Sequence, residues 1–280
     1  MNDNFEGKWP QSKRDALIRL LDDDDPEIYK QIRKTLLSIG KPAQKWLQPH
    51  TLSDNKLIRM RAREILRYCE LKRADEDLLV FCLGRGDLEL ETGLWLFAKS
   101  ADPSINLSAL KILFDDMLLQ YGSIHHANTR YEKVLLDIHD YLTRFITVSE
   151  VTRSDHSAYL YIDKALTNKM AHRDLLVVIC MLAAKRFGIQ FEAVKYQGKV
   201  GLYSPSAPSW IGTLDDEGSH FKIFKTDVDV HDSLSNRQIL MHFCRNLHQL
   251  YKQTCQDKHM KQNLYYLSAL ADSFPGSIEF

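Results

Sequence analysis

The chain has 280 residues, of which 44% are hydrophobic and 26% charged, a composition typical of a globular protein with one large core or two smaller ones. Its 37 Lys and Arg residues equal its 37 Asp and Glu residues, so no basic excess indicates binding to nucleic acid or to an anionic membrane surface. No run of residues approaches the roughly 20 apolar positions that span a bilayer, so we expect no membrane partner.

The N-terminal part of the chain predicts short helices with matching apolar stripes. A first helix is expected over 12–22, and Asp25-Pro26 starts a second, which Gly40 ends, because Asp favours the N-cap, Pro the first helical position and Gly the C-terminal end. The stripe at positions 28, 32, 36 and 39 recurs at 58, 62, 66 and 69 of a helix over 56–70, an offset of 30 residues. Such helices indicate either a short solenoid of the HEAT kind, whose repeat usually runs to about 40–47 residues, or an irregular bundle.

The rest of the chain predicts further helices and one small antiparallel sheet. Apolar residues recur at helical spacing over 75–100, 107–121, 131–145, 155–171, 175–188, 233–253 and 258–273. After Gly188 they alternate with polar residues, and strands are predicted over 189–193, 199–203, 210–213 and 220–226. The expected fold class is α+β and mainly α.

Three segments carry a family resemblance. They are Leu90–Leu107 with its Asp102-Pro103 linker, Leu175–Gly198 as a core helix and first core strand, and Phe243–Gly276 as a helical pair. Their order resembles the SirB-type branch of the bacterial transglutaminase-like superfamily. The resemblance implies a HEAT-like helical module at 1–86, a degenerate papain/transglutaminase-like core at 87–232 and a TPR-like C-terminal helical hairpin at 233–280.

The Cys-His-Asp triad of that superfamily falls on other residue types here. The nucleophile position, at the start of the core helix, falls at about His172 or Arg173. The strand position that usually reads Gly-His falls on Gly198-Lys199, and the acidic position falls near Ile223-Phe224. The resemblance therefore implies the fold without the chemistry, and we expect a non-catalytic protein with no cofactor.

Two other candidates at the core helix have simpler explanations. Cys180 lies about two turns into the helix, beyond the N-terminus that would lower a thiol pKa, so we expect a small buried side chain rather than a nucleophile. His172 and Asp174 form either an acid–base pair or a surface residue beside a helix-capping carboxylate. We favour the second interpretation because most polar residues at helix starts are caps.

A metal site is a further hypothesis. In a strand, Asp227, Asp229 and His231 would share one face and supply ligands for a divalent cation. No metal-binding signature accompanies them or His125, His126 and His220, so we favour a solvated strand exit.

An arginine face is the last candidate. Arg59, Arg63 and Arg67 lie four residues apart on one helix face and would bind an acidic partner, with Asp22–Asp25 as a candidate intramolecular counterpart. A face exposed to solvent is the commoner explanation for such a set.

The sequence as a whole favours a cytoplasmic protein that binds a protein or peptide, since five scattered cysteines without a C-x-x-C pair indicate reduced thiols. The binding surface would be the concave helical module or the degenerate cleft near His172, Lys199 and Tyr203. The alternative is a cysteine- or metal-dependent hydrolase or acyltransferase. Binding of nucleic acid through the arginine face is the least favoured, because the net charge is zero.

Overall fold

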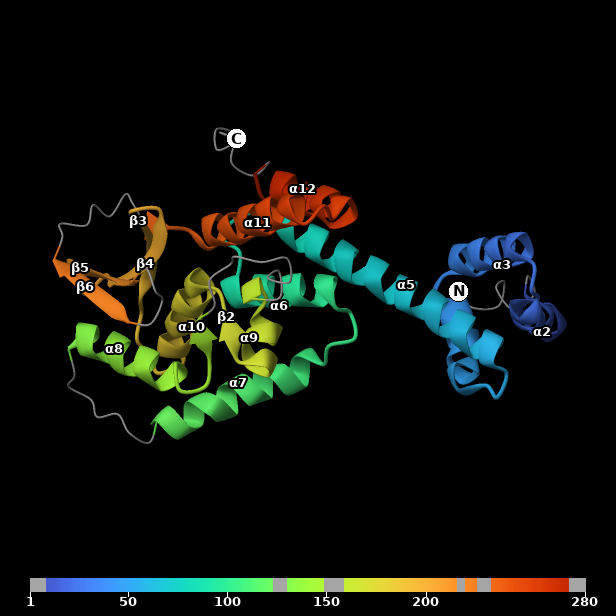
Figure 1. The fold of residues 1–280 in the computed structure, drawn as a ribbon, viewed down its shortest axis with the longest axis horizontal. Helices are drawn as coiled ribbons and strands as arrows, with labels where there is room; N and C mark the ends of the chain where they lie inside the picture. The colour runs from blue at the N-terminus through green and yellow to red at the C-terminus, as the bar shows by residue number, and fades with distance from the viewer. Residues whose placement is uncertain (1–8, 123–129, 149–158, 216–219, 226–232, 272–280) are drawn as a thin grey trace. The chain divides into compact units, whose positions relative to one another are not determined.

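The computed structural model describes residues 9–122, 130–148, 159–215, 220–225 and 233–271. By its contacts the chain divides into two compact units, Met1–Glu76 and Asp77–Phe280. Helices dominate both units, and the strands lie in the second (Figure 1). The prediction of a mainly helical α+β protein is confirmed.

The first unit is built from short helices around a core of its own. They are α2 (Gln11–Arg19), α3 (Pro26–Ile39), α4 (Lys41–Leu47) and the beginning of α5 (Lys56–Cys82), with 3-10 turns at Leu20–Asp22 and Gln48–Leu52. The Asp25 side chain accepts a hydrogen bond from the Glu27 amide at 2.8 Å, and Gly40 ends α3 with φ +76°, as predicted. The core includes Ile32 and Leu36 of the first predicted stripe and Ala62 of the second.

Arg61 of α5 stabilises the interior of this unit. Its side chain is buried, and Nη1 donates to the carbonyl oxygens of Leu21 (3.0 Å) and Asp23 (2.5 Å). The guanidinium also lies 4.3 Å from the ring centre of Tyr29, a favourable cation–π distance. One arginine therefore joins α5 to the turn after α2.

The second unit contains the rest of α5, seven further helices and two sheets within the described residues. The helices are α6 (Leu90–Ala101), α7 (Leu107–Gly122), α8 (Tyr131–Leu142), α9 (Ile162–Asn168), α10 (Arg173–Arg186), α11 (Asn236–Gln253) and α12 (Asp257–Ala271). The strands are β1 (Thr147–Val148), β2 (Met170–Ala171), β3 (Glu192–Tyr196), β4 (Lys199–Ser204), β5 (Ala207–Leu214), β6 (Phe221–Lys225) and β7 (Ser233–Leu234).

The larger sheet is antiparallel and has the strand order β6-β5-β4-β3-β7, while β1 and β2 form a short parallel pair. A tight turn with positive φ at Gln197 (49°) and Gly198 (79°) joins β3 to β4, as the twist of a hairpin requires. One face of the sheet packs on the main core around α10 and α8 through residues such as Leu202 and Phe221. The opposite face carries a small cluster of Val194, Tyr203 and Ile211.

The core helix α10 is buried almost completely. Every residue from Asp174 to Ala184 except Met181 is buried, so the predicted apolar helix is confirmed. On the other side of the core, α6 approaches α11 closely at Gly93, where a Cβ atom would lie 2.8 Å from both methyl carbons of Leu240. A side chain at this position would require Leu240 to shift, so the glycine allows the two helices to pack closely.

Several predicted boundaries are wrong, and each has a local reason. The single helix predicted over 75–100 is two helices, because the Gly84–Gly86 segment interrupts it and Gly86 has φ +85°. In the span predicted as a helix over 155–171, α9 covers only 162–168, and left-handed Lys169 ends it; residues 155–158 lie outside the described part. The first strand is shifted from 189–193 to 192–196.

At the start of α11 the prediction is also wrong. Ser233 and Leu234 form β7 on the edge of β3, and the helix begins only after Ser235, which makes a capping box with Gln238. Helices α11 and α12 form the predicted hairpin and lie side by side (Figure 1). The division at residues 86 and 232 stays a prediction, because compactness alone does not establish which segments fold independently.

Candidate functional site

The second unit contains an open groove of about 1100 Å³. Its walls come from the segment before α6, the last turns of α10, the segment leading into β3, strand β7 and the first turn of α11. This volume lies slightly above the range, roughly 300–1,000 Å³, that is usual for ligand sites. The groove is therefore large enough for several side chains of a ligand.

The groove has an apolar floor and a polar rim. The apolar part of the lining, here called the floor, comes from half-buried Met181, Ile189 and Leu234 and from the buried Leu182 and Ile239. The exposed polar part of the lining, here called the rim, comes from Asp87, Glu89, Lys185, Gln190 and Gln238. This distribution matches ligand sites in which apolar contacts provide affinity and a few polar groups provide orientation.

Arg237 fixes the wall of the groove that lies before α6. Its side chain is 2% exposed, and Nη1 donates to the carbonyl oxygens of Cys82 (3.0 Å) and Leu270 (3.2 Å). Its Nη2 donates to the carbonyls of Gly84 and Gly86, the second at 3.4 Å. One guanidinium from α11 therefore holds the end of α5, the Gly84–Gly86 segment and α12 together.

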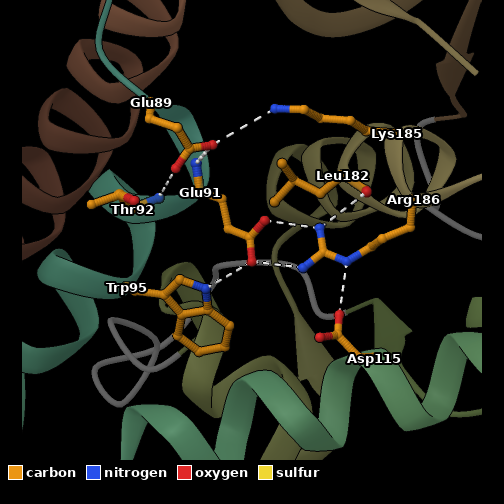
Figure 2. Close-up of polar contacts among 8 residues, drawn as sticks. All are labelled: Glu89, Glu91, Thr92, Trp95, Asp115, Leu182, Lys185 and Arg186. Carbon is orange, nitrogen blue, oxygen red and sulfur yellow. Dashed lines mark hydrogen bonds and ion pairs between the residues drawn. The ribbon is translucent and has the colours of Figure 1, made fainter. Parts of the chain in front are cut away.

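Arg186 fixes the wall that comes from the last turns of α10 by joining this helix to α6 and α7 (Figure 2). Its guanidinium binds both carboxylate oxygens of Glu91, at 2.8 and 2.7 Å, and its Nε donates to Asp115 at 2.9 Å. It also lies 4.6 Å from the ring centre of Phe114. Burial opposes ionisation of Glu91, but the hydrogen bonds from Arg186 and Trp95 hold its pKa below the ordinary value.

The two helix N-termini at the groove are capped by their own side chains. Glu89 accepts from the amides of Glu91 (3.3 Å) and Thr92 (2.5 Å), and the Lys185 ammonium lies 3.8 Å from the same carboxylate (Figure 2). At α11, the backbone N–H of Gln238 donates to the Ser235 hydroxyl at 3.2 Å. A helix start that is already capped has fewer amides to offer an anion, so these two termini do not mark an anion site.

A second polar cluster lies at the start of α10, where the sequence placed a degenerate nucleophile position. His172 is the N-cap and its ring accepts from the Asp174 amide at 3.3 Å, so the cap is the histidine, whereas we predicted a capping carboxylate beside a surface histidine. Asp174 is 4% exposed, and its Oδ2 lies 2.7 Å from Nε2 of His242 on α11. Asn246 lies 3.1 Å from the same nitrogen of His242.

The electrostatics of this cluster favour an ionised carboxylate. Burial raises the pKa of Asp174, but the hydrogen bond and charge of His242, together with His172 and Arg173, outweigh it and leave the pKa below the ordinary value. Burial lowers the pKa of His172. An ionised Asp174 can accept a hydrogen bond from Nε2 of His242.

The four positions carried over from the resemblance do not converge in the structure. His172 and Arg173 begin α10, whereas Lys199 alternates with core-facing Val200 and Leu202 of β4 and so lies on the opposite face of the sheet. Phe224 lies on that opposite face too, 5.6 Å from the ring centre of Tyr196.

The structure tests the thiol hypothesis, but it does not describe the three predicted ligands of the metal hypothesis. Cys180 is completely buried, as predicted, and burial raises the pKa of its thiol. Asp227, Asp229 and His231 lie outside the described residues, as do His125 and His126, while His220 is exposed. In the part of the chain that is described, no group of three or more His, Cys, Asp or Glu side chains is arranged to hold a metal ion.

The arginine face of α5 is only partly available to a partner. Arg59 donates to the carbonyl of Ser53 at 2.5 Å, and Arg63 donates to that of Thr51 at 2.9 Å, so both stabilise the turn before α5. Arg67 is exposed. The segment Asp22–Asp25 is contacted through its backbone by Arg61, rather than through its carboxylates by these three arginines.

No model of a known protein family matches the chain, and no characterised protein matches its sequence at a significant level. The resemblance to the SirB-type branch therefore stays a prediction. Within the described residues, none of the helices combines the length and the apolar character needed to cross a bilayer.

Proposed function

We propose that this protein binds a peptide segment of a partner protein in the groove between α6, α10, β3 and α11. The observation that carries the proposal is the floor of half-buried apolar side chains, Met181, Ile189 and Leu234, inside a polar rim. Methionine adapts its shape to different partners and is common at surfaces that bind peptides.

The fixed walls of the groove support this proposal. Arg237 and Arg186 hold the two sides of the groove through hydrogen bonds to four elements of the fold. A groove whose backbone is ordered before binding loses less conformational entropy when a ligand enters it. We further propose, as the sequence suggested, that the protein is a non-catalytic, transglutaminase-like regulator in the cytoplasm.

The experiment is a selection of random peptides displayed on phage against the full chain, followed by fluorescence anisotropy with the most enriched peptide. Met181→Arg places a charge on the apolar floor and should weaken binding by about tenfold or more, since tenfold corresponds to roughly 1.4 kcal/mol. Ile112→Arg is the matched control, because Ile112 is 60% exposed on α7 and does not line the groove. Equal binding to both variants would place the peptide elsewhere.

One observation favours a second candidate, an enzyme that uses acid–base chemistry. Asp174 orients the ring of His242 at 2.7 Å, an arrangement that general bases often have. Among the described residues, the hydrogen-bond partners of that ring are Asp174 and Asn246, and no Ser, Thr or Cys side chain is one of them. Activity-based probes for serine and cysteine hydrolases, applied to the protein and to His242→Gln, test this candidate: labelling that depends on His242 supports it.

A further inference from the structure

We infer that the groove selects peptides in which a Lys or Arg side chain lies next to an apolar anchor. This inference rests on the proposed function and adds the chemistry of the partner. The charges at the rim carry it.

Five charged side chains line the groove, and two of them are already neutralised by each other. The lining contains Asp87, Glu89, Lys185, Glu192 and Arg237. Lys185 lies 3.8 Å from Glu89, and that carboxylate also caps α6. The opposite charges of Lys185 and Glu89 therefore largely cancel at the position of a ligand.

The positive charge of Arg237 is not available to a ligand either. Its side chain is 2% exposed and donates to four backbone carbonyl oxygens, so a ligand in the groove can reach little of the guanidinium. The N-terminus of α11, which would add positive potential, is occupied by its own capping box. The charges that remain are those of Asp87 and Glu192, both negative.

These two carboxylates retain the capacity to bind a cation. Asp87 accepts one hydrogen bond, from the Asn236 amide at 3.3 Å, and Glu192 accepts one from the Tyr203 hydroxyl at 2.7 Å. An ionised carboxylate offers about four acceptor sites, so each can accept further donors. An ammonium or guanidinium group complements them, whereas an acidic peptide would meet repulsion.

The test uses the most enriched displayed peptide with the full chain, together with two synthetic versions in which its Lys and Arg residues are replaced by Gln or by Glu. Fluorescence anisotropy at low and high salt measures their affinities for the wild type and for Asp87→Asn/Glu192→Gln. Both replacements keep an acceptor oxygen for the Asn236 and Tyr203 hydrogen bonds and remove only charge. Asp116→Asn, exposed on α7 and outside the groove, is the matched control.

We expect the double variant to bind the cationic peptide about tenfold more weakly at low salt, with a smaller difference at high salt, while Asp116→Asn binds like the wild type. Equal binding of the cationic, Gln and Glu peptides would overturn the charge inference and leave peptide binding intact. Enrichment of no peptide at all would refute the proposed function itself. Self-association of the chain that is abolished by Met181→Arg, measured by analytical ultracentrifugation, would identify a second copy as the occupant and overturn both.

Discussion

Replacing Arg237 with Met should destabilise the second unit, because this side chain holds the backbone of three separate segments. The replacement keeps most of the aliphatic volume and removes all donors. The carbonyls of Cys82 and Leu270 lose a hydrogen bond inside the protein, whereas those of Gly84 and Gly86 lie in partly buried positions that water can reach.

The magnitude follows from the two buried carbonyls. Leaving a buried acceptor unsatisfied costs about 1–3 kcal/mol, so two of them give roughly 2–6 kcal/mol. The four acceptors of the buried guanidinium are neutral backbone carbonyl oxygens, so removing the charge also relieves a desolvation penalty that offsets part of this loss. We therefore expect a net decrease of about 3 kcal/mol in the free energy of unfolding.

Urea unfolding followed by hydrogen exchange and mass spectrometry measures this effect locally. Peptides covering 83–89 and the end of α12 should exchange faster in Arg237→Met, and the unfolding midpoint of the second unit should fall. Lys252→Met, an exposed residue of the same helix, is the control and should leave both unchanged. An unchanged midpoint together with unchanged exchange at 83–89 would refute the assignment of Arg237 as the anchor of this wall.

Three further predictions test other parts of the second unit. Arg186→Met leaves Glu91 without its bidentate partner and should lower the free energy of unfolding in urea by about 2 kcal/mol. The double variant with Glu91→Gln should recover part of this loss, whereas strictly additive effects of the two replacements would argue against an interaction between the two residues. Gly93→Val places atoms against Leu240 and should lower the melting temperature through a loss of about 2 kcal/mol or more, whereas an unchanged melting temperature would mean that α6 and α11 are not in close contact. The pKa of Asp174 in the folded state lies below its unfolded value of about 3.9. Its contribution to stability is therefore complete above that value and is lost as the pH falls through the folded pKa. The urea midpoint of Asp174→Asn should vary less with pH between about pH 5 and pH 2 than that of the wild type.

The periodicity of apolar residues predicted most helices of this fold, because each of them buries one face or all of its surface. It predicted the apolar core helix α10 and the stripe through Ile32 and Leu36, both of which are buried. It failed at 83–89, where apolar residues on both sides continue a helical period across Gly84 and Gly86. The glycines were the signal for that break, and the helical period outweighed them.

The groove could not be predicted from periodicity, since its walls come from segments that are far apart in the sequence. One signal was nevertheless present at Arg237. A cation in the first turn of a helix is unfavourable beside the positive end of the helix dipole, so its presence there indicates a tertiary role. Arg186 gave no such signal, because a basic residue in the last turn of a helix is expected there for electrostatic reasons alone.

The pair of Asp174 and His242 illustrates the same limit. The sequence shows Asp174 in the first turn of α10, and a capping carboxylate there is expected. Only the packing of α11 beside α10 brings His242 to 2.7 Å and makes the carboxylate part of a pair. Side chains that acquire a role through tertiary contact cannot be identified from one sequence, because the partner lies on another helix.

The arrangement of the two arginines explains why the groove, rather than the start of α10, is the stronger candidate for binding. Arg237 and Arg186 both donate their hydrogen bonds to the protein itself; Arg237 lines the groove but is only 2% exposed, and Arg186 is not among the lining residues. The walls are therefore fixed by contacts that a ligand does not need to break, while the floor keeps the adaptable side chain of Met181 half-exposed. Binding can then bury the apolar floor without first rebuilding the walls, so hydrogen-exchange protection on adding a peptide should concentrate at 188–193 and 233–239 and leave the Arg186 contacts on α7 unchanged.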